Sequence, residues 1–253
     1  MFRLYIAAVC VLVAPAPGQA FTEECPYGVN AHQASDDALD MVAAAGIGWV
    51  RFDLNWFQFE PSDNSYDWSV ADRFVARCDA LGIHVYMTVS YTPEWAVGVP
   101  CNNADPNWEN WCLNAHPAST SYWTDFVTAV VQRYGGSVKH YGMWNEPNLG
   151  SFYKGTREQY TEEILIAGSN AVHAACPGCK VLGPDLAHLR GAEWDSCEGT
   201  CVPWTCECWY NGWNYSLIQI LGDANPYIDI VTHHKYADPV DEWWGEALDG
   251  EFL

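Results

Sequence analysis

The feature that most constrains the fold is a regular alternation of strand-like and helix-like segments along the chain. Six short runs combine β-branched or aromatic residues with the length of a strand. These runs are Tyr27–Asn30, Trp49–Leu54, His84–Val89, Val138–Trp144, Lys180–Gly183 and Ile228–Thr232. Because strands that alternate with helices form parallel sheets with the helices outside, the sequence predicts an α/β fold of about six strand–helix units.

The segments between these runs are helix-like, with acidic residues near several of their starts and glycines near several of their ends. They are Asp36–Ala45, Ser69–Leu81, Ser121–Tyr134, Arg157–Ala175 and Tyr215–Leu221. Ser35 is placed to cap the first of them, and Gly46 and Gly82 follow the first two. No linker or low-complexity tract interrupts the pattern.

The stretch Trp144-Asn145-Glu146-Pro147-Asn148 follows the fourth strand-like run directly and carries the clearest chemistry. A carboxylic acid can protonate a glycosidic oxygen, an amide can bond a sugar hydroxyl, and an indole can stack on a pyranose face. This combination at a strand end suits a carbohydrate site. The alternative is an ordinary Asn-Glu-Pro turn.

The N-terminus predicts export. Arg3 is followed by an apolar run from Leu4 to Ala14, and Gly18-Gln19-Ala20 has the small residues of a cleavage site. We therefore expect residues 1–20 to be a signal peptide and residues 21–253 to form the mature domain, secreted or periplasmic. A membrane anchor is the alternative, but the run is short for a bilayer span, so we expect no membrane association after cleavage.

Cysteine usage agrees with an oxidising compartment. Cleavage after Ala20 removes one of eleven cysteines, Cys10, and leaves an even number, which indicates disulfides. Cys101 and Cys112 bracket a polar stretch and are expected to close one loop. Six further cysteines lie between Cys176 and Cys208. They could be zinc ligands, but their spacing matches no standard zinc site, so we expect disulfides and no metal.

The charge balance excludes several partners. The chain has 32 Asp and Glu against 11 Lys and Arg, so phosphate backbones and anionic lipids would be repelled.

The chain also has 14 Trp and 14 Tyr, and some of the tryptophans lie in polar stretches. Trp95, Trp108, Trp111 and Trp204 are candidates for a carbohydrate platform, with packing or capping as the alternative for each.

Several motifs in a fixed order carry a family resemblance that extends from Pro26 to Pro239. They are Gly28-Val29-Asn30-Ala31-His32, Gly48 to Trp56, Glu60-Pro61, Tyr66-Asp67-Trp68, Val89 to Ala96, Trp144 to Asn148, Gly183-Pro184-Asp185 and His233-His234-Lys235-Tyr236. In this order the chain resembles the clan GH-A glycoside hydrolases, most closely family 39 and the related family 5-type enzymes. The resemblance implies a (β/α)8 TIM barrel, incomplete here, and a retaining glycosidase.

The resemblance also implies roles for individual residues. Glu146 would be the acid/base, and Asn145 would hold the sugar 2-hydroxyl. Arg51 would orient the nucleophilic carboxylate, with an ion pair to Asp53 or another acid as the alternative. His234 and Tyr236 match a His-x-Tyr pattern in which the tyrosine would steady the nucleophile or substrate, whereas a purely structural histidine is the alternative for His234.

Because neighbours on a strand face opposite ways, we expect His233 to point into the barrel wall. The remaining residues that the resemblance assigns to substrate binding are Asn30, His32, Asp53, Trp56, Tyr91, Trp95, Trp144 and Asn148. It implies no cofactor, and we expect a monomer. Ser90-Tyr91 departs from family 5, which often has histidine there.

A retaining glycosidase needs a second carboxylate about 5 Å from the acid, and in this clan it comes from the seventh strand. The sequence reaches Leu253 soon after the sixth strand, and the tail that contains Glu246 and Glu251 does not resemble a strand ending in glutamate. We therefore expect the nucleophile beyond Leu253 and an inactive 253-residue chain. A naturally short form is the alternative, but an open barrel would expose two sheet edges.

The predicted function is an exported retaining glycoside hydrolase that cleaves a β-linked oligo- or polysaccharide by double displacement. Two alternatives belong to other classes: an inactive carbohydrate-binding protein on a degenerate barrel, and a cysteine-rich extracellular interaction domain for which the barrel is only a scaffold.

Overall fold

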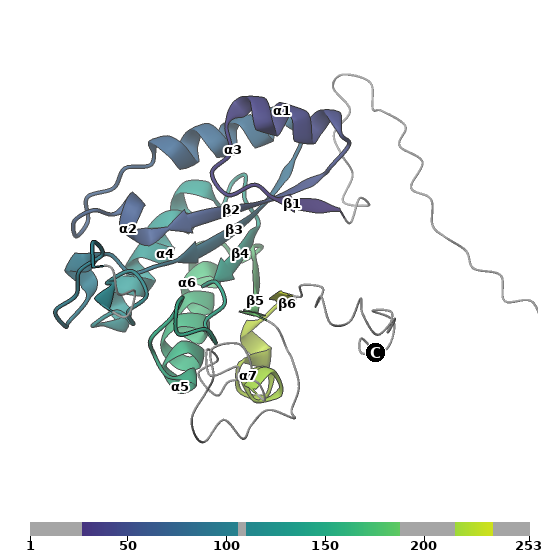
Figure 1. The fold of residues 1–253 in the computed structure, drawn as a ribbon. Coiled ribbons are helices and arrows are strands. Elements are labelled where there is room, and N and C mark those ends of the chain that lie inside the picture. The colour runs from purple at the N-terminus through teal and green to yellow at the C-terminus, as the bar shows by residue number, and fades with distance from the viewer. Residues whose placement is uncertain (1–26, 106–109, 188–215, 235–253) are drawn as a thin grey trace, which may run out of the picture. The chain divides into compact units, whose positions relative to one another are not determined.

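The fold is a six-stranded sheet whose strands are separated by helices. The computed structural model describes residues 27–105, 110–187 and 216–234. The strands are β1 (Gly28–Asn30), β2 (Trp49–Asn55), β3 (His84–Ser90), β4 (His140–Met143), β5 (Lys180–Ala187) and β6 (Ile230–His234). They are hydrogen-bonded in chain order, β1-β2-β3-β4-β5-β6 (Figure 1). The six parallel strands confirm the prediction of an incomplete (β/α)8 barrel.

The helices confirm most of the predicted segments. The α-helices of the described residues are α1 (Asp36–Ala44), α2 (Trp56–Phe59), α3 (Ser69–Leu81), α4 (Thr120–Tyr134), α5 (Arg157–Gln159), α6 (Ala167–Ala175) and α7 (Ser216–Ala224). Two short 3-10 helices are η1 (Glu94–Ala96) and η5 (Asn225–Tyr227), and η3 (Tyr160–Ile166) is a π-helix. The sequence predicted α5, η3 and α6 as one helix, because a π-turn leaves no signal in the helical spacing.

The described residues form two compact units. The first contains residues 27–52 and 68–86, and the second contains residues 53–67 and the described residues from 87 onward. The predicted signal peptide lies outside the described residues.

Helix ends and ion pairs stabilise the first unit. The Ser35 hydroxyl accepts the backbone N–H of Ala38 at 3.3 Å, which confirms the predicted cap of α1. Gly82 ends α3 with a φ of 70°, a left-handed conformation that suits glycine. Arg73 of α3 bonds Asp36 of α1 at 2.6 Å. The Phe52 ring of β2 packs against a phenylalanine of α3, so the two helices cover one face of this part of the sheet.

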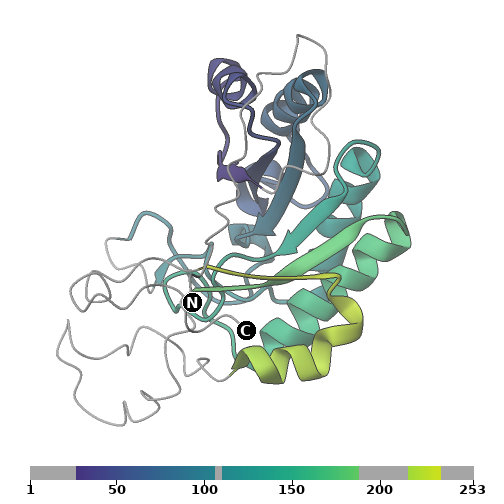
Figure 2. The same ribbon diagram turned by 90° about the vertical axis from the view of Figure 1, so that its right-hand side faces the viewer.

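An aromatic core fills the second unit. Trp123 of α4 is fully buried, and its indole N–H donates to the carbonyl of Ile164 in η3 at 2.9 Å. A Cβ at Gly168 of α6 would lie 2.5 Å from the sulfur of Met143, so only glycine lets α6 approach β4 this closely. Helices α6 and α7 lie beside β5 (Figure 2, green and yellow).

A polar cluster secures the start of β6. The carboxylate of Asp229 bonds Lys180 Nζ at 2.8 Å, the backbone N–H of Val181 at 2.9 Å and His173 Nε2 at 3.0 Å. Ser169 of α6 donates to the carbonyl of Tyr227 at 2.6 Å. These contacts tie β6 to β5 and α6, and they therefore fix the strand that ends at His234.

We predict that Asp229→Asn lowers the free energy of unfolding at pH 7 by about 1 kcal/mol, a value for a partly exposed ion pair. Burial alone would raise the pKa of Asp229, but its hydrogen bonds to Lys180, Val181 and His173 lower it from 3.8 to about 2. The stabilisation is therefore present above pH about 4 and is lost as the pH falls through about 2. Urea denaturation of both proteins from pH 7 to pH 2.5 should show the difference shrink with acid; a constant difference would contradict the assignment.

The described cysteines form two disulfides and leave one thiol free. Cys101 and Cys112 form the predicted loop disulfide, and Cys176 and Cys179 form a second, which excludes zinc at this pair. Cys78 of α3 is a buried free thiol, so not every described cysteine is paired. A small apolar side chain suits its position in the core. The remaining mature cysteines, Cys25, Cys197, Cys201, Cys206 and Cys208, lie outside the described residues.

We predict that a thiol-alkylating reagent labels Cys78 only after unfolding, because burial raises the pKa of this thiol to about 12 and leaves little thiolate. Mass spectrometry of the non-reduced protein, labelled before and after addition of guanidinium, measures this directly. The peptides with Cys101–Cys112 and Cys176–Cys179 serve as controls and should stay unlabelled in both samples. Rapid labelling of Cys78 in the native protein would contradict its burial.

Candidate active site

Unusual backbone conformations gather where the strands of the second unit end. Tyr91 follows β3 with a φ of 69°, Trp144 follows β4 with a φ of 82°, and Glu146 has a φ of 46°. Asp185, near the end of β5, has a φ of 51°. A non-glycine residue in this region costs on the order of 1–3 kcal/mol, and such residues are typical of active sites. The carboxyl ends of β3, β4 and β5 are therefore the first candidate for a site.

Glu146 lies at the centre of this region. It is only 7% exposed, and its backbone N–H donates to the carbonyl of Asp185 at 3.0 Å. Its carboxylate Oε1 lies 2.6 Å from Nδ1 of His234, the last residue of β6. The loop after β4 is thus bonded both to β5 and to β6.

The contact between Glu146 and His234 is a hydrogen bond that can take either of two forms. An imidazole N–H can donate to the ionised carboxylate, or a protonated carboxyl can donate to the imidazole nitrogen. A buried carboxyl group requires such a partner. The arrangement gives Glu146 a fixed orientation and a proton that can be exchanged, both of which a general acid needs.

Asn145 is held beside Glu146 by Tyr91. Its side-chain amide donates to the Tyr91 hydroxyl at 3.3 Å, and the Tyr91 ring meets the Trp144 ring edge-on at 5.9 Å. The backbone carbonyl of Tyr91 in turn accepts the N–H of Phe57 at 3.1 Å. The structure therefore brings together four of the predicted site residues, Tyr91, Asn145, Glu146 and His234.

Asn148 is engaged with the backbone. Its amide nitrogen donates to the carbonyl of Ala187 at 2.8 Å, and its amide oxygen accepts the N–H of Ala187 at 2.9 Å. The residue is 1% exposed. Both ends of the amide thus join the loop to the end of β5, a structural contact that differs from the predicted contact with substrate.

Two of the residues predicted to bind substrate are core residues in this structure. Trp144 and Trp56 are both fully buried, so neither presents a ring face at the surface. The Trp56 indole donates to the carboxylate of Glu60 at 2.6 Å, and the half-buried Trp95 donates to the Glu60 carbonyl at 2.8 Å. Burial raises the pKa of Glu60 despite these bonds. The burial of Trp56 and Trp144 could not be predicted, because sequence spacing does not show which neighbours cover a ring.

The other predicted residues are placed as follows. Asn30, His32 and Arg51 belong to the first unit, where Asn30 is in register with Arg51 across β1 and β2. The Arg51 guanidinium lies 5.9 Å from the centre of the Tyr86 ring. Asp53 is half-buried on β2. Tyr236, Trp108 and Trp204 lie outside the described residues, and His233 is half-buried beside His234.

Asp185 belongs to one of the ordered motifs but is not among the predicted site residues. It is 1% exposed and supplies the carbonyl that positions the Glu146 backbone. Its signal in the sequence was only its place in Gly183-Pro184-Asp185.

In the part of the chain that the structure describes, no three His, Cys, Asp or Glu side chains are grouped to hold a metal ion. The helices of the same residues include none with the length and apolar composition of a membrane span.

Comparisons with known proteins agree with this geometry. The family model Glyco_hydro_42, described as beta-galactosidase, matches residues 26–145. A beta-xylosidase of Geobacillus stearothermophilus is 22% identical over 182 residues, which are 68% of this chain and 31% of the relative. Endo-1,4-beta-xylanase A of Fusarium oxysporum is 28% identical over 93 residues, which are 37% of this chain and 26% of the relative. The chain thus spans about a third or less of the length of these relatives.

Solved structures show the same fold. The GH39 enzyme of Xanthomonas axonopodis pv. citri aligns with a TM-score of 0.59 and 20% identity, over 87% of this chain and 42% of that one. A monomeric beta-xylosidase of Caulobacter crescentus CB15 aligns with a TM-score of 0.56 and 20% identity, over 83% and 41%. The fold is that of a glycoside hydrolase barrel. These findings confirm the resemblance found in the motifs: the chain is similar to clan GH-A glycoside hydrolases, and it shares the fold of family 39 enzymes.

We predict that Asn148→Ala lowers the free energy of unfolding by about 1–3 kcal/mol, because it leaves the buried N–H and carbonyl of Ala187 without their partners. Asn145→Ala is the matched control, since the bond of this half-buried neighbour to the Tyr91 hydroxyl is longer, at 3.3 Å. Chemical denaturation of the two variants measures the difference. Equal losses would show that the Asn148–Ala187 pair does not hold the loop.

Proposed function

We propose that the protein is an exported, retaining glycoside hydrolase with Glu146 as its acid/base. The observation that carries the proposal is the buried carboxyl of Glu146 at the end of β4, bonded at 2.6 Å to His234 at the end of β6. Catalytic residues of a (β/α)8 barrel lie at the carboxyl ends of its strands. A structural ion pair would not require the left-handed backbone of Glu146, which costs free energy.

The proposed reaction is a double displacement. Glu146 donates its proton to the glycosidic oxygen as a second carboxylate attacks the anomeric carbon, and it then removes a proton from the water that releases the sugar. His234 orients the Glu146 carboxyl and exchanges a proton with it. Asn145, held by Tyr91, is placed to bond the 2-hydroxyl, an interaction that strengthens in the transition state.

Arg51 and Tyr236 keep the roles that the resemblance implies, the orientation of the nucleophile and of the substrate. Within the described residues we assign no carboxylate to the nucleophile. The clan supplies it from a seventh strand, about 5 Å from the acid. The mechanism requires no cofactor, because both steps use only carboxyl groups and water.

The proposed substrate class is a β-linked oligo- or polysaccharide. The names of the matched family and of both curated relatives all denote activity on β-linked sugars, galactoside in one case and xyloside or xylan in the others. The net charge of −21 favours an uncharged partner over nucleic acid or an anionic membrane. The two disulfides fit export, and a monomeric beta-xylosidase with this fold supports a monomer.

We predict that Glu146→Gln, in the protein expressed from its complete gene, reduces kcat/KM for aryl β-glycosides with poor leaving groups by about 10²–10⁴-fold. A nitrophenolate-type leaving group needs little protonation, so its kcat/KM should fall much less. Steady-state rates on a series of aryl glycosides, plotted against the pKa of the leaving phenol, measure the difference.

Glu162→Gln is the matched control, because Glu162 is an exposed glutamate of η3 and should leave both rates unchanged. A Glu146→Gln variant that retains wild-type rates on both kinds of substrate would remove Glu146 from the catalytic site.

A further inference from the structure

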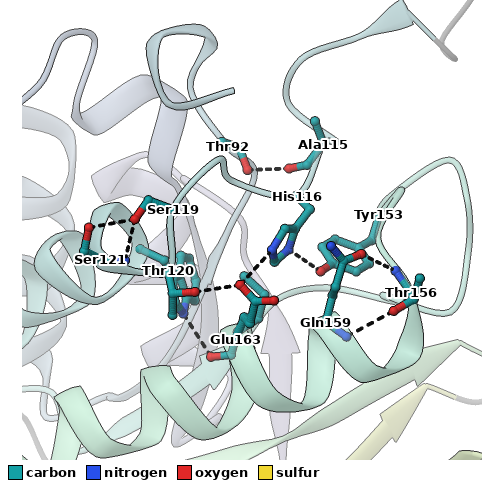
Figure 3. Close-up of polar contacts among 12 residues, drawn as sticks. Thr92, Ala115, His116, Ser119, Thr120, Ser121, Tyr153, Thr156, Gln159 and Glu163 are labelled. Atoms are coloured by element: carbon teal, nitrogen blue, oxygen red, sulfur yellow. Dashed lines mark hydrogen bonds and ion pairs between the residues drawn. The ribbon is translucent and has the colours of Figure 1, made fainter. Parts of the chain in front are cut away.

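A second group of polar side chains joins His116, Tyr153 and Glu163 (Figure 3). The Tyr153 hydroxyl lies 2.7 Å from His116 Nδ1, and His116 Nε2 lies 3.3 Å from Glu163 Oε2. Thr120, at the start of α4, donates its hydroxyl to the same carboxylate oxygen at 2.7 Å. This hydroxyl–imidazole–carboxylate cluster, formed by Thr120, His116, Tyr153 and Glu163, lies within the second unit and is not used by the proposed reaction.

The cluster has one consistent direction of hydrogen bonding. Burial lowers the pKa of His116, although Glu163 opposes this, so the imidazole has a single N–H to donate. The hydrogen bond from Thr120 lowers the pKa of Glu163 and keeps it an acceptor. His116 Nε2–H therefore donates to Glu163, and Nδ1 accepts. Burial raises the pKa of Tyr153, which remains protonated and donates to Nδ1.

Tyr153 links this cluster to the site. It is fully buried, and its ring meets the Trp144 ring edge-on at 5.1 Å. The Trp144 indole donates to the carbonyl of Phe152 at 2.9 Å, and the N–H of Lys154 donates to the carbonyl of Asn114 at 2.8 Å. The loop that follows Glu146 therefore holds Trp144 on one side and is bonded to the His116 segment on the other.

The Tyr153 hydroxyl has little room to move. A Cβ on Gly155 would lie 2.4 Å from the hydroxyl oxygen, so the hydroxyl fills the space beside the glycine backbone. If His116 no longer accepts, the buried hydroxyl loses this hydrogen bond, and the ring can shift relative to Trp144.

We propose that His116 is a positioning residue: by accepting the Tyr153 hydroxyl, it holds Tyr153 against Trp144 and so fixes the left-handed turn that presents Asn145 and Glu146. Its effect on catalysis rests on the function proposed above, whereas its effect on the turn does not. Glu163 and Thr120 fix the tautomer of His116 that can accept this hydrogen bond.

The test compares three substitutions in the protein expressed from its complete gene. His116→Phe keeps a ring but removes both hydrogen bonds, Tyr153→Phe removes only the hydroxyl, and His116→Gln retains one acceptor and one donor. Because a small misplacement of a catalytic group can cost up to about 10²-fold, we expect His116→Phe and Tyr153→Phe to lower kcat about tenfold or more with little change in KM. His116→Gln should recover most of the loss.

His173→Phe is the matched control. His173 has the same kinds of partner, the Ser169 hydroxyl at 3.3 Å and the Asp229 carboxylate at 3.0 Å, but it belongs to α6, and without it Asp229 still bonds Lys180 and the Val181 N–H, which hold β6 in place. It should lower stability while kcat changes less than about twofold. A loss of kcat in His116→Phe no greater than in His173→Phe would overturn the proposal.

A second measurement separates this inference from the proposed function. The indole N–H resonance of Trp144, assigned with Trp144→Phe, reports the bond to Phe152 in ¹H–¹⁵N NMR spectra without any substrate. It should shift in His116→Phe and Tyr153→Phe but not in His173→Phe. An unshifted resonance overturns the positioning role even if Glu146→Gln is inactive. If the protein hydrolyses no glycoside, the proposed function fails and this resonance alone decides the inference.

Discussion

The bond between Glu146 and His234 depends on the register of three neighbouring strands. Strand β4 pairs with β5 through Tyr141 and Val181, and β5 pairs with β6 up to Ala187 and His234. Because parallel strands end at the same edge of a sheet, this register brings the residue after β4 and the last residue of β6 together across 88 positions of sequence. A shift of one residue in the β5–β6 pair would turn His234 to the opposite face of the sheet, and a shift in the β4–β5 pair would turn the side chains of β4 in the same way.

The helical layer fixes this arrangement from outside. Tyr160 of η3 directs its hydroxyl to the carbonyls of Met143 and Pro184, at 2.9 and 3.0 Å. Met143 ends β4 just before the turn that carries Glu146, and Pro184 lies in β5 next to Asp185. Gly168 brings α6 against Met143 at the same place. The π-helix η3 and the close contact at Gly168 thus couple the ends of β4 and β5 to the helices.

The second unit contains two polar clusters of the same composition. A hydroxyl, a histidine and a carboxylate are joined at His116, next to the Trp144–Glu146 turn, and again at His173, where β6 begins. The direction of the bonds differs, because Ser169 gives its hydrogen to the Tyr227 carbonyl whereas Tyr153 gives its hydrogen to the histidine. The first group orients the loop that carries Glu146, and the second secures the strand that carries His234. Both ends of the Glu146–His234 bond are therefore supported by a buried or half-buried polar cluster.

The sequence by itself determined what depends on neighbours along the chain. It predicted the strand–helix order, the bounds of α3, the cap at Ser35 and the disulfide between Cys101 and Cys112, because each arises from residues close in sequence. The ordered motifs predicted the barrel class and the site residues Asn145, Glu146 and His234. The sequence did not predict the short helix α2 or the π-helix η3, since a few residues give no periodic signal.

The tertiary structure alone decided burial and pairing. It placed Trp56 and Trp144 in the core, left Cys78 as a free thiol, joined both ends of the Asn148 amide to Ala187, and brought His116 to Tyr153. Each of these outcomes depends on atoms that arrive from distant segments. A side chain's type states which bonds it can form, but only the packed chain determines which partner is within reach and whether water remains to compete for it.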